Sequence, residues 1–363
     1  MKKEGLFSYW QHASFKRYRQ LLDVFGSLER AFANTDQRKF VSIWKPELAS
    51  DFLNWKYSID ETKLEQELHE RGIKCIGYTH PEFPEFLGHL HDPPVALFVR
   101  GTIPKTHTFV SVVGTRKYSS YGRRVTHMYV RELSRYTICI VSGLAFGIDA
   151  IAHRAALEFG IPTIAVLPGS VGPADIAPQT HTGLAEKIIH AGGALVSEHP
   201  PGFEPFKSSF ARRNRIVAAL SKVTLVVEAP EKSGALITAD VATDLGRDVF
   251  AVPHDIYNLR GIGTNALIAK GAYPAHTAQS IPQHLGLQAT QKYDTNNATQ
   301  NIDGNELRVL NPLSNTPMHI DELSRTLNIH TSQLLGILTE LELKGFVQNI
   351  GSMNYIKHTT GNV

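Results

Sequence analysis

Short apolar runs alternate with amphipathic stretches between residues 76 and 285. Six of these runs predict strands, because they are continuous, rich in β-branched residues and separated by turn residues. They cover residues 109–113, 138–142, 163–167, 194–197, 223–227 and 249–252. The stretches between them, such as 148–159 and 184–191, have helical spacing. This alternation predicts an α/β fold with a Rossmann-like parallel sheet covered on both faces, whose ligands bind beyond the carboxyl ends of the strands.

The pattern differs on both sides of this core. Residues 1–75 have helical spacing and predict a small helical (SAM-like) domain, in which Asp60 is the N-cap of a helix that ends near Gly72. Residues 286–304 are polar and predict a linker. Residues 305–363 follow the order helix, turn, helix, hairpin, which is typical of a winged-helix module.

Composition changes this picture little. The 363 residues carry a net charge of +3, which is too mild to indicate nucleic-acid binding by itself. Cys75 and Cys139 lie in apolar runs and predict buried, reduced thiols rather than a disulfide or a metal site. The 17 histidines show no metal-ligand spacing, and the chain has neither a signal-peptide core nor an apolar run long enough for a membrane. We therefore expect a cytoplasmic protein without metal or cofactor.

The basic residues cluster in two stretches that contain no acidic residue. Residues 101–131 follow the first core strand through Gly114, and residues 205–222 follow the fourth. In the second stretch, Phe206 and Phe210 alternate with cations. Cations for phosphates together with aromatic rings for bases are what single-stranded nucleic acid requires, although a solvated face is the alternative for the first stretch. We expect both stretches to meet at one edge of the sheet.

Other turns after strands offer polar groups. The second strand ends in Ser142 and Gly143 and is followed by Gly147. Asp149 and His153 are one helical turn apart there, so they form either a general-base pair or, as we favour, a structural brace of the loop. Ser233 and Gly234 begin a helix and could donate to a phosphate. For Glu228 we expect a role in orienting a neighbouring arginine.

Taken together, these runs resemble the DNA-processing protein A (DprA/Smf) family. The matching stretches include Val113-Gly-Thr-Arg116, Ser142-Gly-Leu-Ala-x-Gly-Ile-Asp149, Arg213-Asn-Arg-Ile-Val217, Ser233-Gly-Ala-Leu-Ile-Thr-Ala239 and Gly246-Arg-Asp-Val-Phe-Ala-Val-Pro253. The resemblance implies a homodimer that binds and protects single-stranded DNA during natural transformation, helps to load the RecA recombinase and is not an enzyme. We expect the following residues to bind DNA: Gly114, Thr115, Arg116, Lys117, Ser142, Gly143, Gly147, Lys207, Phe210, Arg213, Asn214, Arg215, Ser233 and Gly234.

The chain departs from the family pattern at three places. His254 and Ala219 stand where glycine is usual, and residues 168–178 look expanded. A Rossmann-like nucleotide-binding enzyme and a nucleotide sensor are the alternative functions, although neither a P-loop motif nor Gly-x-Gly-x-x-Gly after the first strand is present. The winged-helix module is not basic, because residues 306–363 contain four Lys or Arg and five Asp or Glu. A module that reads duplex DNA should carry an excess of positive charge. We therefore expect the winged helix to contact protein or to assist binding rather than to read duplex DNA.

Overall fold

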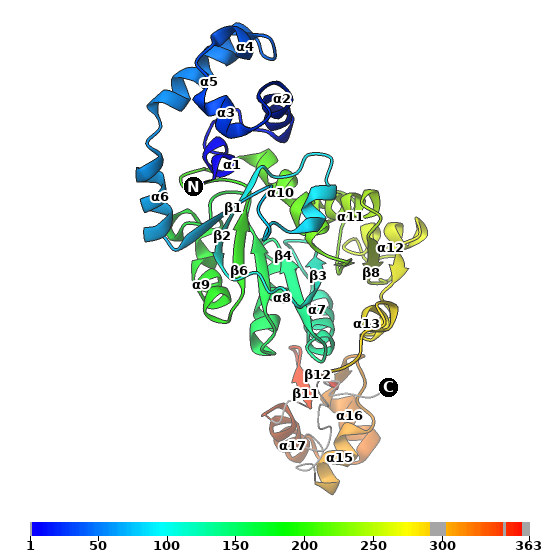
Figure 1. Cartoon of the computed structure of the whole chain (residues 1–363). Coiled ribbons are helices and arrows are strands. Elements are labelled where there is room, and N and C mark those ends of the chain that lie inside the picture. Colours follow the sequence, from blue (N-terminus) through cyan, green and yellow to red (C-terminus); the bar gives the residue numbers. More distant parts are fainter. Residues whose placement is uncertain (1, 291–302, 344–345, 358–363) are drawn as a thin grey trace. The chain divides into compact units, whose positions relative to one another are not determined.

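The computed structural model describes residues 2–290, 303–343 and 346–357. The chain divides into two compact units, one up to residue 291 and one after it (Figure 1). The predicted linker over 286–304 lies largely outside the described residues, so it stays a prediction. No helix within the described ranges is long and apolar enough to cross a membrane.

Six helices form the N-terminal part of the first unit. They are α1 (Lys3–Phe7), α2 (Phe15–Phe25), α3 (Leu28–Ala33), α4 (Gln37–Val41), α5 (Pro46–Ser58) and α6 (Glu61–Glu70). Asp60 caps α6 as predicted, because its side chain accepts a 3.1 Å hydrogen bond from the Lys63 N–H. Aromatic side chains such as Trp10, Phe40 and Phe52 fill the core between these helices.

A nine-stranded sheet forms the centre of the first unit. Its strand order is β1-β2-β6-β5-β4-β3-β7-β8-β9, and the seven strands from β6 to β9 in this order are parallel. The strands are β1 (Ile73–Gly77), β2 (Ala96–Gly101), β3 (Thr108–Val113), β4 (Ile138–Ser142), β5 (Thr163–Val166), β6 (Ala194–Ser197), β7 (Val223–Val226), β8 (Asp248–Ala251) and β9 (Tyr273–Pro274). All six predicted strands are confirmed. The antiparallel edge of β1 and β2 and the short β9 were not predicted.

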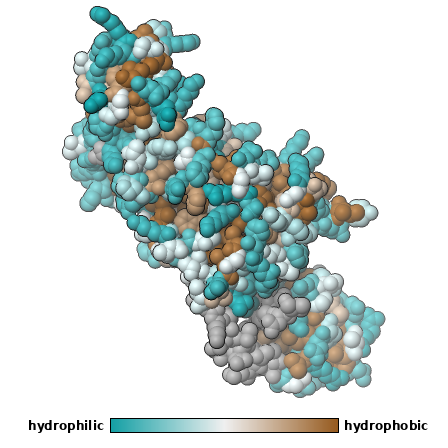
Figure 2. Space-filling model, turned by 45° about the vertical axis from the view of Figure 1, so that its right-hand side comes forward, coloured by the Kyte–Doolittle hydropathy of each residue, from teal (hydrophilic) through white to brown (hydrophobic). Residues whose placement is uncertain are grey.

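Helices cover both faces of this sheet (Figure 1). They are α7 (Ser120–Leu133), α8 (Ile148–Glu158), α9 (Thr182–His190), α10 (Lys207–Leu220), α11 (Gly234–Asp244), α12 (Ile262–Ala269) and α13 (Ser280–His284). Because side chains alternate along a strand, Val112 joins the apolar core of α7 and α8 while Val113 joins that of α10 and α11. The two-layered cover of a mainly parallel sheet confirms the predicted Rossmann-like α/β core. At the surface, Figure 2 shows hydrophobic side chains scattered among hydrophilic ones.

The second unit has its own core. It contains α15 (Gly304–Leu310), α16 (Ile320–Leu327), α17 (Thr331–Leu343) and a three-stranded antiparallel sheet in the order β10-β12-β11. The strands are β10 (Met318–His319), β11 (Val347–Asn349) and β12 (Asn354–Lys357). Leu323, Leu334, Leu338 and Tyr355 are buried together between helices and sheet. This arrangement confirms the predicted winged-helix outline and adds α15.

Candidate nucleic-acid interface

The loop between β3 and α7 is fixed by its own backbone and by its neighbours. The Thr115 N–H donates to the Glu228 carbonyl at 2.7 Å, and the Thr115 hydroxyl accepts from the Lys117 N–H at 3.2 Å. A side chain at Gly114 would lie 2.6 Å from Ile148, so only glycine allows this close approach. Arg116 and Lys117 are exposed, so this fixed loop presents two positively charged side chains to solvent.

A second loop, between β4 and α8, packs against the first. Gly147 has φ +83°, and a Cβ there would lie 2.3 Å from the Thr115 carbonyl oxygen. The Ser142 hydroxyl is buried and donates to the Val112 carbonyl at 2.7 Å. The Asp149 carboxylate accepts from the N–H groups of Gly143, at 3.1 Å, and Ala145, at 3.4 Å. These contacts stiffen the floor of the site.

Arg213 lies beneath these loops rather than on the surface. Its side chain is 5% exposed, and its guanidinium donates to the carbonyl oxygens of Gly143 and Val166, which follow β4 and end β5. Burial lowers the pKa of Arg213 to about 10, although the nearby Asp149 carboxylate opposes this. The structure therefore gives Arg213 a bracing position between two strand ends.

The first turn of α10 brings the second basic stretch to the first loop. Lys207 is the exposed first residue of this helix, and Phe210 follows one turn later. The Arg116 guanidinium lies over the Phe210 ring, 5.3 Å from its centre. Cation and aromatic ring therefore form one surface, as the sequence predicted from the meeting of the two stretches.

The remaining arginines of α10 are engaged by carboxylates. Glu198, which follows β6, forms ion pairs with both Arg212, at 3.3 Å, and Arg215. Arg215 also donates to the Asp92 backbone carbonyl at 2.6 Å. Within the described residues Arg116, Lys117 and Lys207 form no such ion pair, so each of them is available to an anion.

The start of α11 closes the other side of the site. Ser233 caps this helix by accepting a 3.3 Å hydrogen bond from the Ala235 N–H. The Asn214 side-chain amide donates to the Gly234 carbonyl at 3.1 Å and so links α10 to α11. Hydrogen bonds thus connect Gly143, Arg213, Asn214 and Gly234, and a cation–π contact joins Arg116 to Phe210, whereas Arg215 turns to Asp92 and Glu198.

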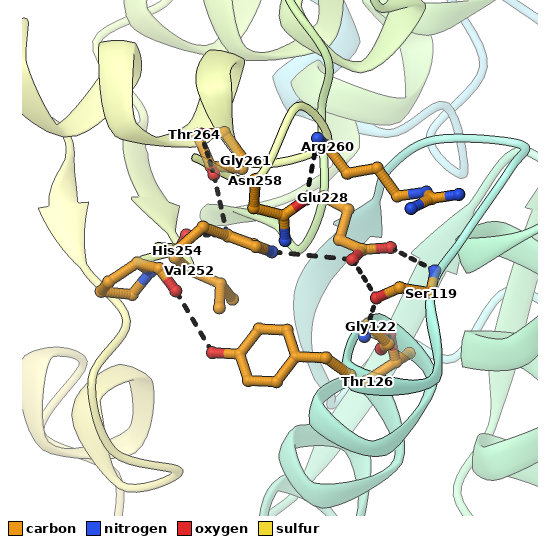
Figure 3. A network of polar contacts seen from close by, with 12 residues as sticks. Ser119, Gly122, Thr126, Glu228, Val252, His254, Asn258, Arg260, Gly261 and Thr264 are labelled. Atoms are coloured by element: carbon orange, nitrogen blue, oxygen red, sulfur yellow. Dashed lines mark hydrogen bonds and ion pairs between the residues drawn. The ribbon is translucent and has the colours of Figure 1, made fainter. Parts of the chain in front are cut away.

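Glu228 has a different role from the one expected. Its carboxylate accepts from the backbone N–H of Ser119 at 2.9 Å and from the Ser119 hydroxyl, and it lies 3.7 Å from Nε2 of His254 (Figure 3). In the part of the chain that the structure describes, no arginine forms an ion pair with the Glu228 carboxylate, so Glu228 anchors the start of α7 instead. A side chain at Gly122 would lie 2.3 Å from this carboxylate, which explains the glycine.

Asp149 and His153 do not form the general-base pair that was the alternative. Asp149 binds the loop N–H groups, whereas Nδ1 of His153 lies 2.7 Å from the Thr163 hydroxyl. Burial lowers the pKa of His153 to about 3, so the imidazole is neutral near pH 7. The favoured interpretation, a brace of the loop, agrees with this geometry.

Phe146 is an exposed aromatic residue near the site that the sequence analysis missed. It lies in the second loop, next to Gly147, and its ring is 46% exposed. A large apolar residue in a glycine-rich turn after a strand was the available signal. Its ring packs edge-on against His181, with the ring centres 4.9 Å apart, while the neighbouring Gly147 lies against the backbone of Arg116.

Residues 74–286 match the family model described as DNA recombination-mediator protein A, and residues 294–350 match that of the DprA winged helix domain. Protein Smf from Escherichia coli is 43% identical over 195 residues, which cover 53% of this chain and 52% of that protein. DNA processing protein DprA from Bacillus subtilis is 38% identical over 218 residues, which cover 60% and 72%. The chain thus spans about half the length of the Escherichia coli protein and 72% of the Bacillus subtilis protein.

Two solved structures agree with these matches. DNA processing protein A from Streptococcus pneumoniae superimposes with a TM-score of 0.65 at 30% identity, covering 77% of this chain and 95% of that one. DNA processing protein A from Helicobacter pylori, whose structure is described by its single-stranded DNA binding mode, has a TM-score of 0.52 at 31% identity, covering 59% and 95%. With the first family model matching more than half of its residues, this chain belongs to the DNA recombination-mediator protein A (DprA/Smf) family.

Proposed function

We propose that this protein binds single-stranded DNA at the carboxyl ends of its parallel strands. The observation that carries the proposal is the Arg116 guanidinium over the Phe210 ring, beside the exposed cations Lys117 and Lys207. Cations bind the phosphates, and an aromatic ring can stack on a base of any identity. The single-strand binding mode named for the Helicobacter pylori relative supports the same ligand.

We further propose that the protein works in the cytoplasm as a homodimer, protects incoming DNA in natural transformation and helps to load RecA. The family description as a recombination mediator supports a recombinase partner. We also propose that it acts without catalysis. The carboxylate of Asp149, the candidate general base, and the nearby Ser142 hydroxyl are both buried and hydrogen-bonded within the protein, which supports this proposal.

A salt titration of binding tests the proposal. A fluorescent single-stranded oligonucleotide is compared with the matching duplex, and a mononucleotide is added as competitor. We expect preference for the single strand, a steep fall of affinity with salt and no competition, because several phosphates bind together. Effective competition by the mononucleotide, or release of its base, would favour the nucleotide enzyme or sensor instead.

A further inference from the structure

The loop of residues 255–261, between β8 and α12, exposes three large apolar side chains. Ile256 is 79% exposed, Tyr257 87% and Leu259 73%, more than any other large apolar side chain in the part of the chain that the structure describes. A cluster of this kind on a surface marks a place where another molecule binds. None of these three residues belongs to the site described above.

The backbone of this loop is held in one conformation. The Asp255 side chain accepts from the Tyr257 N–H at 2.8 Å, and the Asn258 side chain accepts from the Arg260 N–H at 3.0 Å. The Arg260 carbonyl accepts from the Ala229 N–H at 2.8 Å, which fastens the loop to the end of β7. Because these hydrogen bonds fix the backbone of the loop, a ligand that binds there does not have to order it.

The loop adjoins the candidate DNA site. Nε of Arg260 donates to the Lys117 carbonyl at 3.0 Å, so this side chain bridges the two loops. Behind the loop, the buried His254 imidazole lies between Thr264, whose hydroxyl is 3.1 Å from Nδ1, and Glu228 (Figure 3). His254 and Glu228 thereby join the base of the 255–261 loop to the start of α7, on which the first loop also depends.

We propose that the 255–261 loop is a second contact site for the same DNA strand, with the Tyr257 ring stacked on a base beyond those held at Arg116 and Phe210. This inference rests on the proposed function. The ring offers a face that any base can stack on, and the cations Lys117 and Arg260 lie between the two sites, where the connecting phosphates would pass. A flexible single strand can therefore stack one base at each site while its negatively charged backbone passes these cations.

A second copy of this chain is the other partner that an apolar loop could bind. The three side chains offer on the order of 400 Å² together, whereas a stable interface takes about 800 Å² from each partner. The cations Lys117 and Arg260 adjoin the loop, and a polyanion complements this positive charge, whereas the same basic surface on a second copy does not. Size and charge therefore favour the nucleic acid.

The test compares Tyr257→Ala with wild type on oligothymidylates of roughly 5 and roughly 20 nucleotides. We expect the variant to bind the long strand about tenfold more weakly and the short strand as wild type does, because only the long strand reaches the second site. Tyr257→Phe should retain wild-type affinity. Tyr57→Ala on α5 is the matched control, since Tyr57 is also exposed, at 64%.

Three other outcomes have distinct meanings. Equal losses on both strands would overturn the inference, because the loop would then support the first site instead of forming a second. Unchanged binding of both strands would also overturn it, and a simultaneous fall in molecular mass by light scattering would assign the loop to a second copy of the chain. Failure of the wild type to bind either strand would refute the proposed function itself.

Discussion

Arg116 is the residue whose position most directly favours phosphate binding. It is exposed, forms no ion pair within the described residues, and is oriented by its contact with Phe210. We expect Arg116→Ala to weaken single-strand binding and to reduce the slope of log affinity against log salt by about 0.7, since one phosphate contact is lost. Arg154→Ala, an exposed arginine within α8, is the control and should leave the slope unchanged. An unchanged slope in Arg116→Ala as well would contradict the assignment.

For Arg213 we expect an effect on stability instead of a direct effect on phosphate binding. Its removal leaves the carbonyl oxygens of Gly143 and Val166 and the carboxylate of Asp149 without their buried partner. We expect Arg213→Ala to lower the free energy of unfolding by about 3–5 kcal/mol, measured by urea denaturation. If Arg213→Ala keeps wild-type stability but its affinity for single-stranded DNA depends less steeply on salt, the phosphate contact inferred from the sequence would be supported instead.

The sequence held a signal that separates these arginines. Ser209, Arg213, Ile216 and Leu220 recur at helical spacing and form the buried stripe of α10. The position of Arg213 on that stripe predicts burial, whereas charge and composition alone treat every arginine of the segment alike. Which carboxylates engage the remaining arginines was not predictable, because Asp92 and Glu198 reach α10 only through tertiary structure.

At the scale of elements, the parallel strands were predictable because each is a continuous buried run, as in β4 and β7. β1 was missed because the exposed Lys74 and the half-buried Cys75 interrupt its buried run, and because it is stabilised by pairing with β2. The predicted boundary at residue 75 falls within β1, and both sides of it belong to one compact unit. Such pairing depends on contacts between distant segments, which local pattern does not contain.

The start of α7 offers a test at this scale. Burial raises the pKa of the Glu228 carboxyl, but the contact with His254 and the hydrogen bonds from Ser119 outweigh it, so the pKa lies below the ordinary value of 4.5. A carboxyl with a lowered pKa in the folded state stabilises it above the ordinary pKa and loses this contribution as the pH falls through the folded value. We expect Glu228→Gln to be less stable than wild type by about 1–2 kcal/mol near neutral pH.

The pH dependence distinguishes this role from a general packing defect. Urea denaturation of wild type and Glu228→Gln at several pH values should show the difference in stability shrinking once the pH falls below 4.5, because wild type then loses the charge that the variant already lacks. A difference that stays constant with pH would mean that the carboxylate charge contributes nothing to holding Ser119.

For the whole molecule, the division into two units allows a test of whether the first unit alone binds single-stranded DNA. The residues that we assign to DNA lie between 114 and 261, within the first unit, and the second unit has its own apolar core. Deleting residues 303–363 should therefore leave single-strand affinity within about twofold and the salt slope unchanged, since no assigned phosphate contact is lost. Thermal unfolding of the shortened chain provides the control for folding. A loss of affinity beyond about tenfold with a shallower slope would show that the winged helix contacts DNA after all, despite its balanced charge.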